Sequence, residues 1–327
     1  MTKPAKSSVP ESPALLTPAA EELLRGLRAT GFVGWSALGI ESGRAAILDM
    51  KAFAGSVEPI FRVEEIRISR RDASDIRAVL YVPESPEPAP VMVYMHGGGW
   101  VLGNYTGVDT IARALVNRSG CAILSIDYSL APEHKYPAAL EDVYRALEWV
   151  VANAEQWGLD SRRLAVGGDS SGANLAAGVS LLCRDRSGPM PVFQLLVYPA
   201  LDHDYNNGSY QRYGDGVSSA LSRADVVWFH NHYVSRSEDL DLPYVSPLRA
   251  ESLARTPRTL LICAEIDPLL DDSIEYARRL ENLGVLVELQ VYPGMFHGFW
   301  RVRGILPEAR EAIDYAAAKL KEAMTAR

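Results

Sequence analysis

Six largely apolar runs, separated by helical patterns, constrain the fold of this chain most strongly. The runs span residues 91–95, 121–126, 163–168, 193–198, 259–266 and 286–292. Continuous runs of this kind predict strands buried on both faces, as in a parallel sheet. Helical patterns at about 107–118, 137–156, 171–186 and 272–284 lie between most of them, and one at 307–325 follows the last. This alternation predicts α/β architecture with right-handed crossovers.

Two more strands are expected before the apolar runs. Residues 61–68 and 76–82 alternate apolar and polar side chains, which is typical of half-exposed antiparallel strands. We therefore expect an α/β fold with a mostly parallel central sheet of about eight strands, flanked by helices.

Two segments fall outside this rhythm and predict a helical cap. Residues 1–56 combine a loose tail, up to about residue 18, with helical patterns that begin after Thr17 and again near residue 41. Thr17 is a suitable N-cap because Pro18 stands at the first helical position. Residues 203–257 carry no clear strand and are rich in Tyr, Trp, His, Ser and Asp. We expect residues 57–202 and 258–327 to form the core that these two segments cover.

Composition excludes several classes of partner. The 327 residues carry a formal net charge of −8, which argues against nucleic acid or an anionic membrane surface. No run of 18 uncharged apolar residues occurs, so no membrane span is expected. The N-terminus lacks a signal-peptide core, and Cys121, Cys183 and Cys263 lie in apolar stretches, as buried thiols in a reducing compartment do. These features predict a cytoplasmic protein.

The strongest chemical signal is the sequence Gly168-Asp169-Ser170-Ser171-Gly172. It directly follows an apolar strand and opens an apolar helix. In that context a sharp turn presents the Ser170 hydroxyl at the carboxyl end of the sheet, and the glycines permit the strained backbone. The helix N-terminus behind the serine also favours developing negative charge. This pattern predicts that Ser170 is a nucleophile.

A second glycine-rich loop, HGGGW (96–100), follows the strand at 91–95. Consecutive glycines leave backbone N–H groups unshielded, so they can bind the oxyanion of a tetrahedral intermediate. We expect the amides of Gly98, Gly99 and Ser171 to form this oxyanion hole. His96 is expected to order the loop and not to act as the general base.

The remaining catalytic groups are expected after the last two strands. Asp267 follows the strand at 259–266 and His297 follows the next one. The order Ser170, Asp267, His297 is the hydrolase order of nucleophile, acid and histidine, and each residue follows a strand end, where α/β sheets place their chemistry. Glu265 and Asp271 are rival acids for the same role.

Metal chemistry has little support in the sequence. His230 and His232 are two residues apart in a predicted helix, which points them to different faces. The sequence Asp202-His203-Asp204 is more simply a polar loop. We expect no metal and no organic cofactor.

The four sequence blocks together resemble the hormone-sensitive-lipase-like esterase family, also called bacterial esterase group IV. They are HGGGW (96–100), DYSLAPEHKYPAALED (127–142), GDSSG (168–172) and YPGMFHGF (292–299). The resemblance implies the α/β-hydrolase fold and a serine carboxylesterase that acts on short- to medium-chain acyl esters. The family commonly has alanine after the nucleophile, where this chain has Ser171. The block at 127–142 is expected to brace the glycine loop and the serine turn.

Several aromatic residues of the predicted cap and loops could line an apolar substrate pocket. They are Phe32, Trp35, Trp100, Tyr205, Tyr210, Trp228 and Phe229. We name Trp100, Phe32, Trp35 and Tyr205 as candidate substrate-binding residues, with ordinary cap packing as the alternative for each.

The triad leaves other functions open. Amide, lactone or thioester hydrolysis, and acyl transfer to an acceptor other than water, use the same groups. Receptors of this fold bind a ligand without hydrolysis, but they lack the histidine that this chain has at His297. The resemblance also implies a possible homodimer through 286–292 and 307–325, which could equally be an ordinary edge strand and surface helix.

Overall fold

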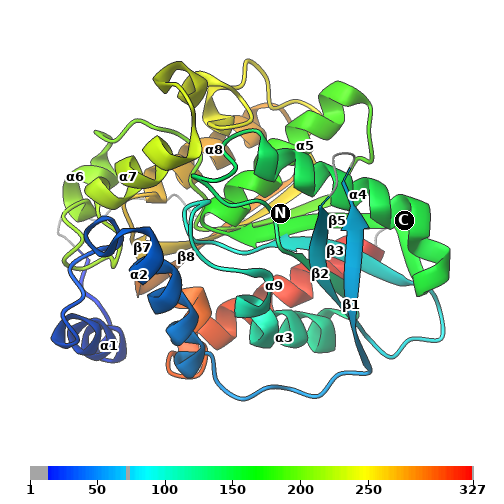
Figure 1. The fold of residues 1–327 in the computed structure, drawn as a ribbon, viewed down its shortest axis with the longest axis horizontal. Coiled ribbons are helices and arrows are strands. Elements are labelled where there is room, and N and C mark those ends of the chain that lie inside the picture. Colours follow the sequence, from blue (N-terminus) through cyan, green and yellow to red (C-terminus); the bar gives the residue numbers. More distant parts are fainter. Residues whose placement is uncertain (1–13, 71–73, 326–327) are drawn as a thin grey trace, which may run out of the picture.

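A computed structural model describes residues 14–70 and 74–325, and it contains a single central sheet (Figure 1). In chain order its strands are β1 (Arg62–Ser69), β2 (Asp75–Val82), β3 (Ala89–Met95), β4 (Ala122–Ile126), β5 (Leu159–Asp169), β6 (Phe193–Val197), β7 (Arg258–Ile266) and β8 (Val287–Phe296). The spatial order is β1-β2-β4-β3-β5-β6-β7-β8. Strands β1 and β2 are antiparallel to their neighbours, and all other pairs are parallel. The predicted fold class is confirmed.

Helices cover both faces of the sheet. Helices α4 (Ala138–Trp157), α5 (Ser171–Arg186) and α8 (Leu270–Asn282) pack on one face, and α3 (Asp109–Ser119) and α9 (Pro307–Thr325) pack on the other. Because both faces are covered, every residue of β4 and β6 is buried. Strand β2 is also buried from Ala78 onward, so its predicted half-exposure is wrong there. The reason is its position between β1 and β4, where alternate side chains enter the two cores.

The first N-terminal helix begins at the predicted position, whereas the second begins earlier. Helix α1 (Pro18–Ala29) has Thr17 as its N-cap, and the Thr17 hydroxyl accepts a hydrogen bond from the Ala20 amide at 3.4 Å. Helix α2 (Trp35–Asp49) starts about six residues earlier than predicted. It contains a kink at Gly39, whose φ of 72° interrupts the helical backbone and obscures the periodicity of the first turn. The predicted tail up to residue 18 lies mostly outside the described residues.

The segment 203–257 contains helices α6 (Gly208–Tyr213) and α7 (Arg223–Tyr233) and contributes no strand to the sheet. Helix α7 contacts α2, so two segments about 190 residues apart meet on the same side of the molecule. Short 3-10 helices connect other elements: η1 (Met50–Phe53), η2 (Tyr105–Val108), η3 (Ser237–Asp241), η4 (Pro247–Arg249) and η5 (Phe299–Val302). None of the helices in the described ranges is long and apolar enough to cross a membrane.

Candidate active site

The predicted serine turn joins β5 to α5 and is strained. Ser170 has φ 56° and ψ −119°, a conformation that side-chain-bearing residues rarely adopt. The turn also runs against the end of β3, so that a Cβ atom on Gly172 would lie 2.1 Å from the Met95 carbonyl oxygen, and one on Gly168 would lie 2.4 Å from it. The Ser170 amide donates to the Val197 carbonyl at 2.8 Å. Glycine at both positions therefore lets the turn hold the serine at the N-terminus of α5.

The structure brings the three predicted catalytic side chains into one hydrogen-bonded chain. His297 Nε2 lies 3.0 Å from Ser170 Oγ, and His297 Nδ1 lies 2.7 Å from Asp267 Oδ2. The other Asp267 oxygen accepts the Leu269 amide at 2.9 Å, and the carboxylate is buried. An ionised carboxylate only accepts hydrogen bonds, so it selects the tautomer with the proton on Nδ1. That tautomer leaves Nε2 free to accept the serine proton.

The two rival acids have other partners. Glu265 Oε2 accepts the Gly294 amide at 2.8 Å, just before the histidine loop. Asp271 Oδ2 accepts the Ser209 amide at 2.8 Å, and its other oxygen lies 3.4 Å from Arg212. Each therefore ties a loop in place, whereas the carboxylate against the His297 ring is that of Asp267.

The glycine loop needs backbone conformations and space that only glycine provides. Gly98 has φ 132° and Gly99 has φ 60°. A Cβ atom would lie 2.2 Å from the Leu102 carbonyl oxygen at Gly98 and 2.1 Å from the Phe229 ring at Gly99. Among the described residues, no protein acceptor takes the amides of Gly98, Gly99 or Ser171. All three predicted oxyanion donors thus remain available, and both glycines line the same pocket as Ser170.

His96 braces the glycine loop from beneath. Its ring is fully buried and stacks on Tyr128 at a centroid distance of 4.4 Å, and its Nδ1 lies 2.9 Å from the Gly97 carbonyl oxygen. Burial lowers the pKa of His96 to about 4, so the ring is neutral at pH 7. Tyr128 and Ala131 also hydrogen-bond to the carbonyls of His96 and Trp100. The block at 127–142 therefore contacts the loop that it is expected to brace.

One polar cluster at the site was missed by sequence reasoning. Asp169 is buried beside the serine and accepts hydrogen bonds from Tyr94 and from the Gly97 amide, each at 3.1 Å. Arg301, on η5, pairs with the same carboxylate at 2.7 Å. Although burial alone would lower it, the charge of Asp169 raises the pKa of Arg301 above its usual value. The available signal was a single cation in the apolar stretch Phe299–Val302, four residues after His297.

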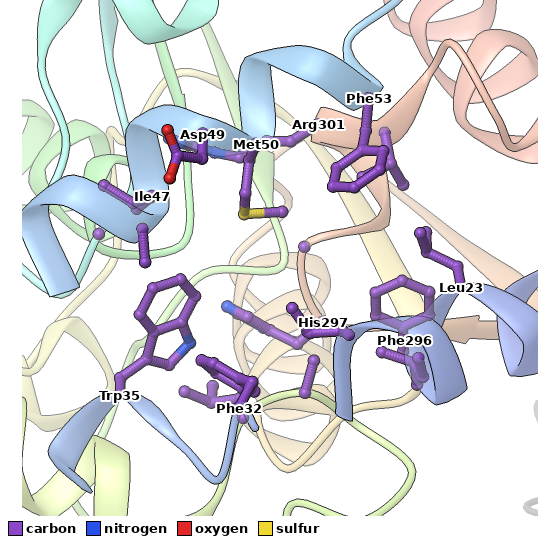
Figure 2. A pocket seen from close by; sticks show the side chains of 18 of the residues that line it. Leu23, Phe32, Trp35, Ile47, Asp49, Met50, Phe53, Phe296, His297 and Arg301 are labelled. Carbon is purple, nitrogen blue, oxygen red and sulfur yellow. The ribbon is translucent and has the colours of Figure 1, made fainter. Parts of the chain in front are cut away.

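A large apolar cavity opens beside the serine and the histidine. Its volume is about 900 Å³, which suits a drug-sized molecule. Figure 2 shows His297 in the middle of this cavity, surrounded by apolar side chains from several segments. Many of the lining residues come from α1, α2 and η1 and include Leu23, Leu27, Ile47, Met50 and Phe53.

The four candidate substrate-binding residues divide into two pairs. Phe32 and Trp35 line the large cavity, with ring centroids 5.1 Å apart in an edge-to-face arrangement. Trp100 is buried and stacks on Tyr233 at 4.5 Å, where it borders only a narrow space of about 20 Å³ beside Ser170. Tyr205 lies outside both spaces, and its hydroxyl lies 2.8 Å from His230 Nδ1. The structure thus places Phe32 and Trp35 in the large cavity, and Trp100 and Tyr205 outside it.

The chain is similar to known α/β hydrolases and esterases along most of its length. A family model described as alpha/beta hydrolase fold matches residues 92–301. The chain is 38% identical to carboxylesterase NlhH of Mycobacterium tuberculosis over 88% of this chain and 91% of the relative. It is 34% identical to ethyl acetate hydrolase of Pseudomonas putida over 82% of this chain and 85% of the relative.

A solved esterase structure is also similar to this chain along nearly its whole length. The hyperthermophilic esterase from the archaeon Pyrobaculum calidifontis is 38% identical, with a TM-score of 0.87 over 94% of this chain and 98% of that one. The chain therefore belongs to the α/β-hydrolase fold family, in the hormone-sensitive-lipase-like branch that its motifs indicated.

Proposed function

We propose that this carboxylic ester hydrolase cleaves short- to medium-chain acyl esters through an acyl-enzyme on Ser170. The observation that best supports this proposal is the hydrogen-bonded chain Ser170–His297–Asp267 at the wall of an apolar cavity. In the proposed mechanism the Ser170 oxygen attacks the ester carbonyl carbon while His297 takes its proton. Asp267 stabilises the imidazolium, and the amides of Gly98, Gly99 and Ser171 bind the oxyanion.

The second half of the reaction uses the same groups. His297 returns the proton to the leaving alcohol, and the acyl group stays bonded to Ser170. Water then loses a proton to His297 as it attacks the acyl carbonyl, and the carboxylic acid leaves with Ser170 restored. No step in this sequence needs a metal or an organic cofactor.

We also propose that residues 1–56 and 203–257 act together as a cap over this site. The support is that α1, α2 and Phe229 of α7 all contribute to the cavity that contains Ser170. A cap of this kind excludes water from the reacting ester and selects the substrate by shape. The cytoplasmic location and the homodimer remain predictions.

Hydrolysis of p-nitrophenyl esters from acetate to palmitate tests the proposal. We expect activity to peak at short or medium chains, and we expect Ser170→Ala to abolish it. Ser180→Ala is the matched control, because Ser180 is a buried serine of α5, the helix that follows Ser170, and its hydroxyl donates to the Ala176 carbonyl. A rate that rises steadily to palmitate would refute the chain-length claim, and full activity in Ser170→Ala would refute the nucleophile. Product analysis with an added alcohol separates hydrolysis from acyl transfer.

A further inference from the structure

Arg301 joins three active-site segments through one side chain. It lies on η5, four residues after His297, and its side chain is only 11% exposed. Its Nε donates to Asp169 Oδ2 at 2.7 Å, and its Nη2 donates to the Gly97 carbonyl oxygen at 3.1 Å. The histidine segment is thereby tied to both the serine turn and the glycine loop.

The bond to Gly97 acts directly on an oxyanion donor. The Gly97 C=O and the Gly98 N–H belong to one planar trans peptide unit, in which they point in opposite directions. A donor that fixes the direction of the Gly97 carbonyl therefore also fixes the direction of the Gly98 amide. His96 Nδ1 also lies 2.9 Å from this carbonyl oxygen. Because a carbonyl oxygen only accepts, this hydrogen bond requires the His96 tautomer with its proton on Nδ1.

The peptide group between His96 and Gly97 is held by Asp169, the partner of Arg301 in the ion pair. The Gly97 amide donates to Asp169 Oδ1, so Gly97 is fixed through both its N–H and its C=O. No side chain fits at this position, since a Cβ atom on Gly97 would lie 2.6 Å from Asp169 atoms. Tyr94 donates to the same carboxylate and accepts a hydrogen bond from Trp300 at 3.1 Å, which adds a second tie to η5.

The positive charge of Arg301 is expected to have a second effect on formation of the oxyanion. Asp169 directly precedes Ser170, and its carboxylate is buried near the place where the oxyanion forms. An unpaired negative charge there would disfavour a second one. The Arg301 guanidinium neutralises this carboxylate.

We infer that Arg301 is a positioning residue of the oxyanion hole, which orients the Gly98 amide through the Gly97 carbonyl and through Asp169. This inference rests on the proposed function of Ser170. Arg301 borders the cavity (Figure 2), but its hydrogen bonds go to the serine turn and the glycine loop, and methionine would keep an unbranched side chain at that wall. Its loss should therefore lower kcat and leave KM largely as it is.

The test compares Arg301→Met with Arg303→Met on p-nitrophenyl butyrate. Arg303 is a matched control because it is also buried and ion-paired at the end of η5, but its partners are Glu58 and the Thr110 carbonyl, away from Ser170. We expect kcat of Arg301→Met to fall by about 10–100-fold, part of the loss typical for one oxyanion donor. Arg303→Met should keep its kcat, whatever its melting temperature.

A transition-state analogue provides a readout that a purely structural role would not move. A trifluoromethyl ketone adds to Ser170 and places an oxyanion in the hole, with the serine proton on His297. Its affinity should fall in Arg301→Met by the same factor as kcat/KM. The affinity of the corresponding alcohol, which forms no oxyanion, should not change. Equal kcat losses in the two arginine variants, or an unchanged ketone affinity, would overturn the inference.

A double-mutant cycle with Asp169→Asn tests whether Arg301 and Asp169 act on the oxyanion hole through the same contacts. If both residues act through the peptides of Gly97, the double variant should lose less than the product of the two single losses. Losses that multiply would show independent effects and contradict the shared route. Ser170→Ala distinguishes a failure of this inference from a failure of the proposed function. Activity that survives in that variant would remove the proposed function itself and not only the role of Arg301.

Discussion

The proposed catalytic edge of the sheet and the proposed cap present different kinds of side chain to the cavity. At the sheet edge, strand ends present polar groups that bond to one another, as Asp267, Asp169 and Glu265 each do. The cap presents mainly apolar side chains to the cavity, whereas its polar bonds to the core, such as Arg44 to Glu133 and Ser209 to Asp271, join residues that do not line it. The two cap segments are joined to each other by the hydrogen bonds from Ser36 to Asp225.

This difference separates chemistry from selection. A site built from short hydrogen bonds between strand ends keeps its geometry when the substrate changes. An apolar cap can vary in shape while leaving that geometry intact. Changes at the sheet edge should therefore affect kcat, and changes in the cap should affect KM and stability.

The largest effect is expected for the acid of the triad. Asp267→Asn should lower kcat by about 10⁴-fold, because the amide no longer selects the tautomer with the proton on Nδ1. Glu265→Gln and Asp271→Asn are the matched controls, since neither carboxylate pairs with His297 in the structure. Steady-state kinetics on one ester measures all three variants. A loss of kcat in Glu265→Gln or Asp271→Asn as large as that in Asp267→Asn would show that Asp267 is wrongly assigned as the acid.

The next largest effect is expected at the Ser36–Asp225 clasp, the pair of hydrogen bonds that joins the two cap segments. Asp225 caps α7 and also accepts hydrogen bonds from the Ser36 amide at 2.8 Å and the Ser36 hydroxyl at 2.7 Å. Asp225→Ala should lower the free energy of unfolding by about 2–4 kcal/mol, since it leaves two helix N-termini without their acceptor. KM should rise more than kcat falls, because Trp35 on the cavity wall precedes Ser36.

Asp239→Ala is the control for this clasp. Asp239 lies in the same segment but bonds only locally, to Arg236. It should cost some stability and leave KM unchanged. A KM shift of equal size in both variants would show that the clasp has no specific role at the pocket.

A pH dependence is expected from a buried histidine in each region. Burial lowers the pKa of His96 to about 4 and of His230 to about 3, below the unfolded value of about 6.5. Between those values the unfolded chain binds a proton that the folded chain does not, so stability falls as pH falls. From pH 6.5 to 5 each histidine should lower the free energy of unfolding by about 1.5 kcal/mol.

Chemical denaturation of wild type and His230→Asn at both pH values measures this slope. The difference between the two proteins isolates His230, because other groups such as Asp272, whose burial raises its pKa, contribute equally to both. Identical slopes in the two proteins would contradict a buried, neutral His230.

The smallest effect is expected inside the pocket. Trp35→Ala should raise KM for hexanoate and octanoate esters by about 3–10-fold, with kcat little changed, since it removes apolar contact area. Tyr205→Phe is the comparison, because Tyr205 lies outside the cavity and loses only its bond to His230. A KM change for Tyr205→Phe as large as that for Trp35→Ala would place the substrate elsewhere.

The same division explains what could be predicted from the sequence. Ser170, Asp267 and His297 each follow an apolar strand, and parallel strands bring their carboxyl ends to one edge, so their meeting could be expected. The glycine loop was recognisable because Gly98 and Gly99 adopt backbone conformations that other residues avoid.

The side chains around the cavity and beneath the serine turn follow no comparable rule. Trp100 has φ 61°, and its ring stacks on Tyr233 outside the large cavity, a placement that nothing in the sequence indicates. Arg301 was overlooked because a single cation in an apolar stretch usually reaches solvent. Its buried partner, Asp169, is recognisable only once the fold brings η5 against the serine turn.

Covalent labelling tests the central claim, that Ser170 is a nucleophile activated by His297. Wild-type protein treated with a fluorophosphonate should gain the mass of one phosphonyl group, located on the peptide that contains Ser170. Ser170→Ala should gain none, and His297→Ala should react far more slowly while remaining folded. Equal labelling of Ser170→Ala and wild type, or a folded wild type that does not react, would contradict the account.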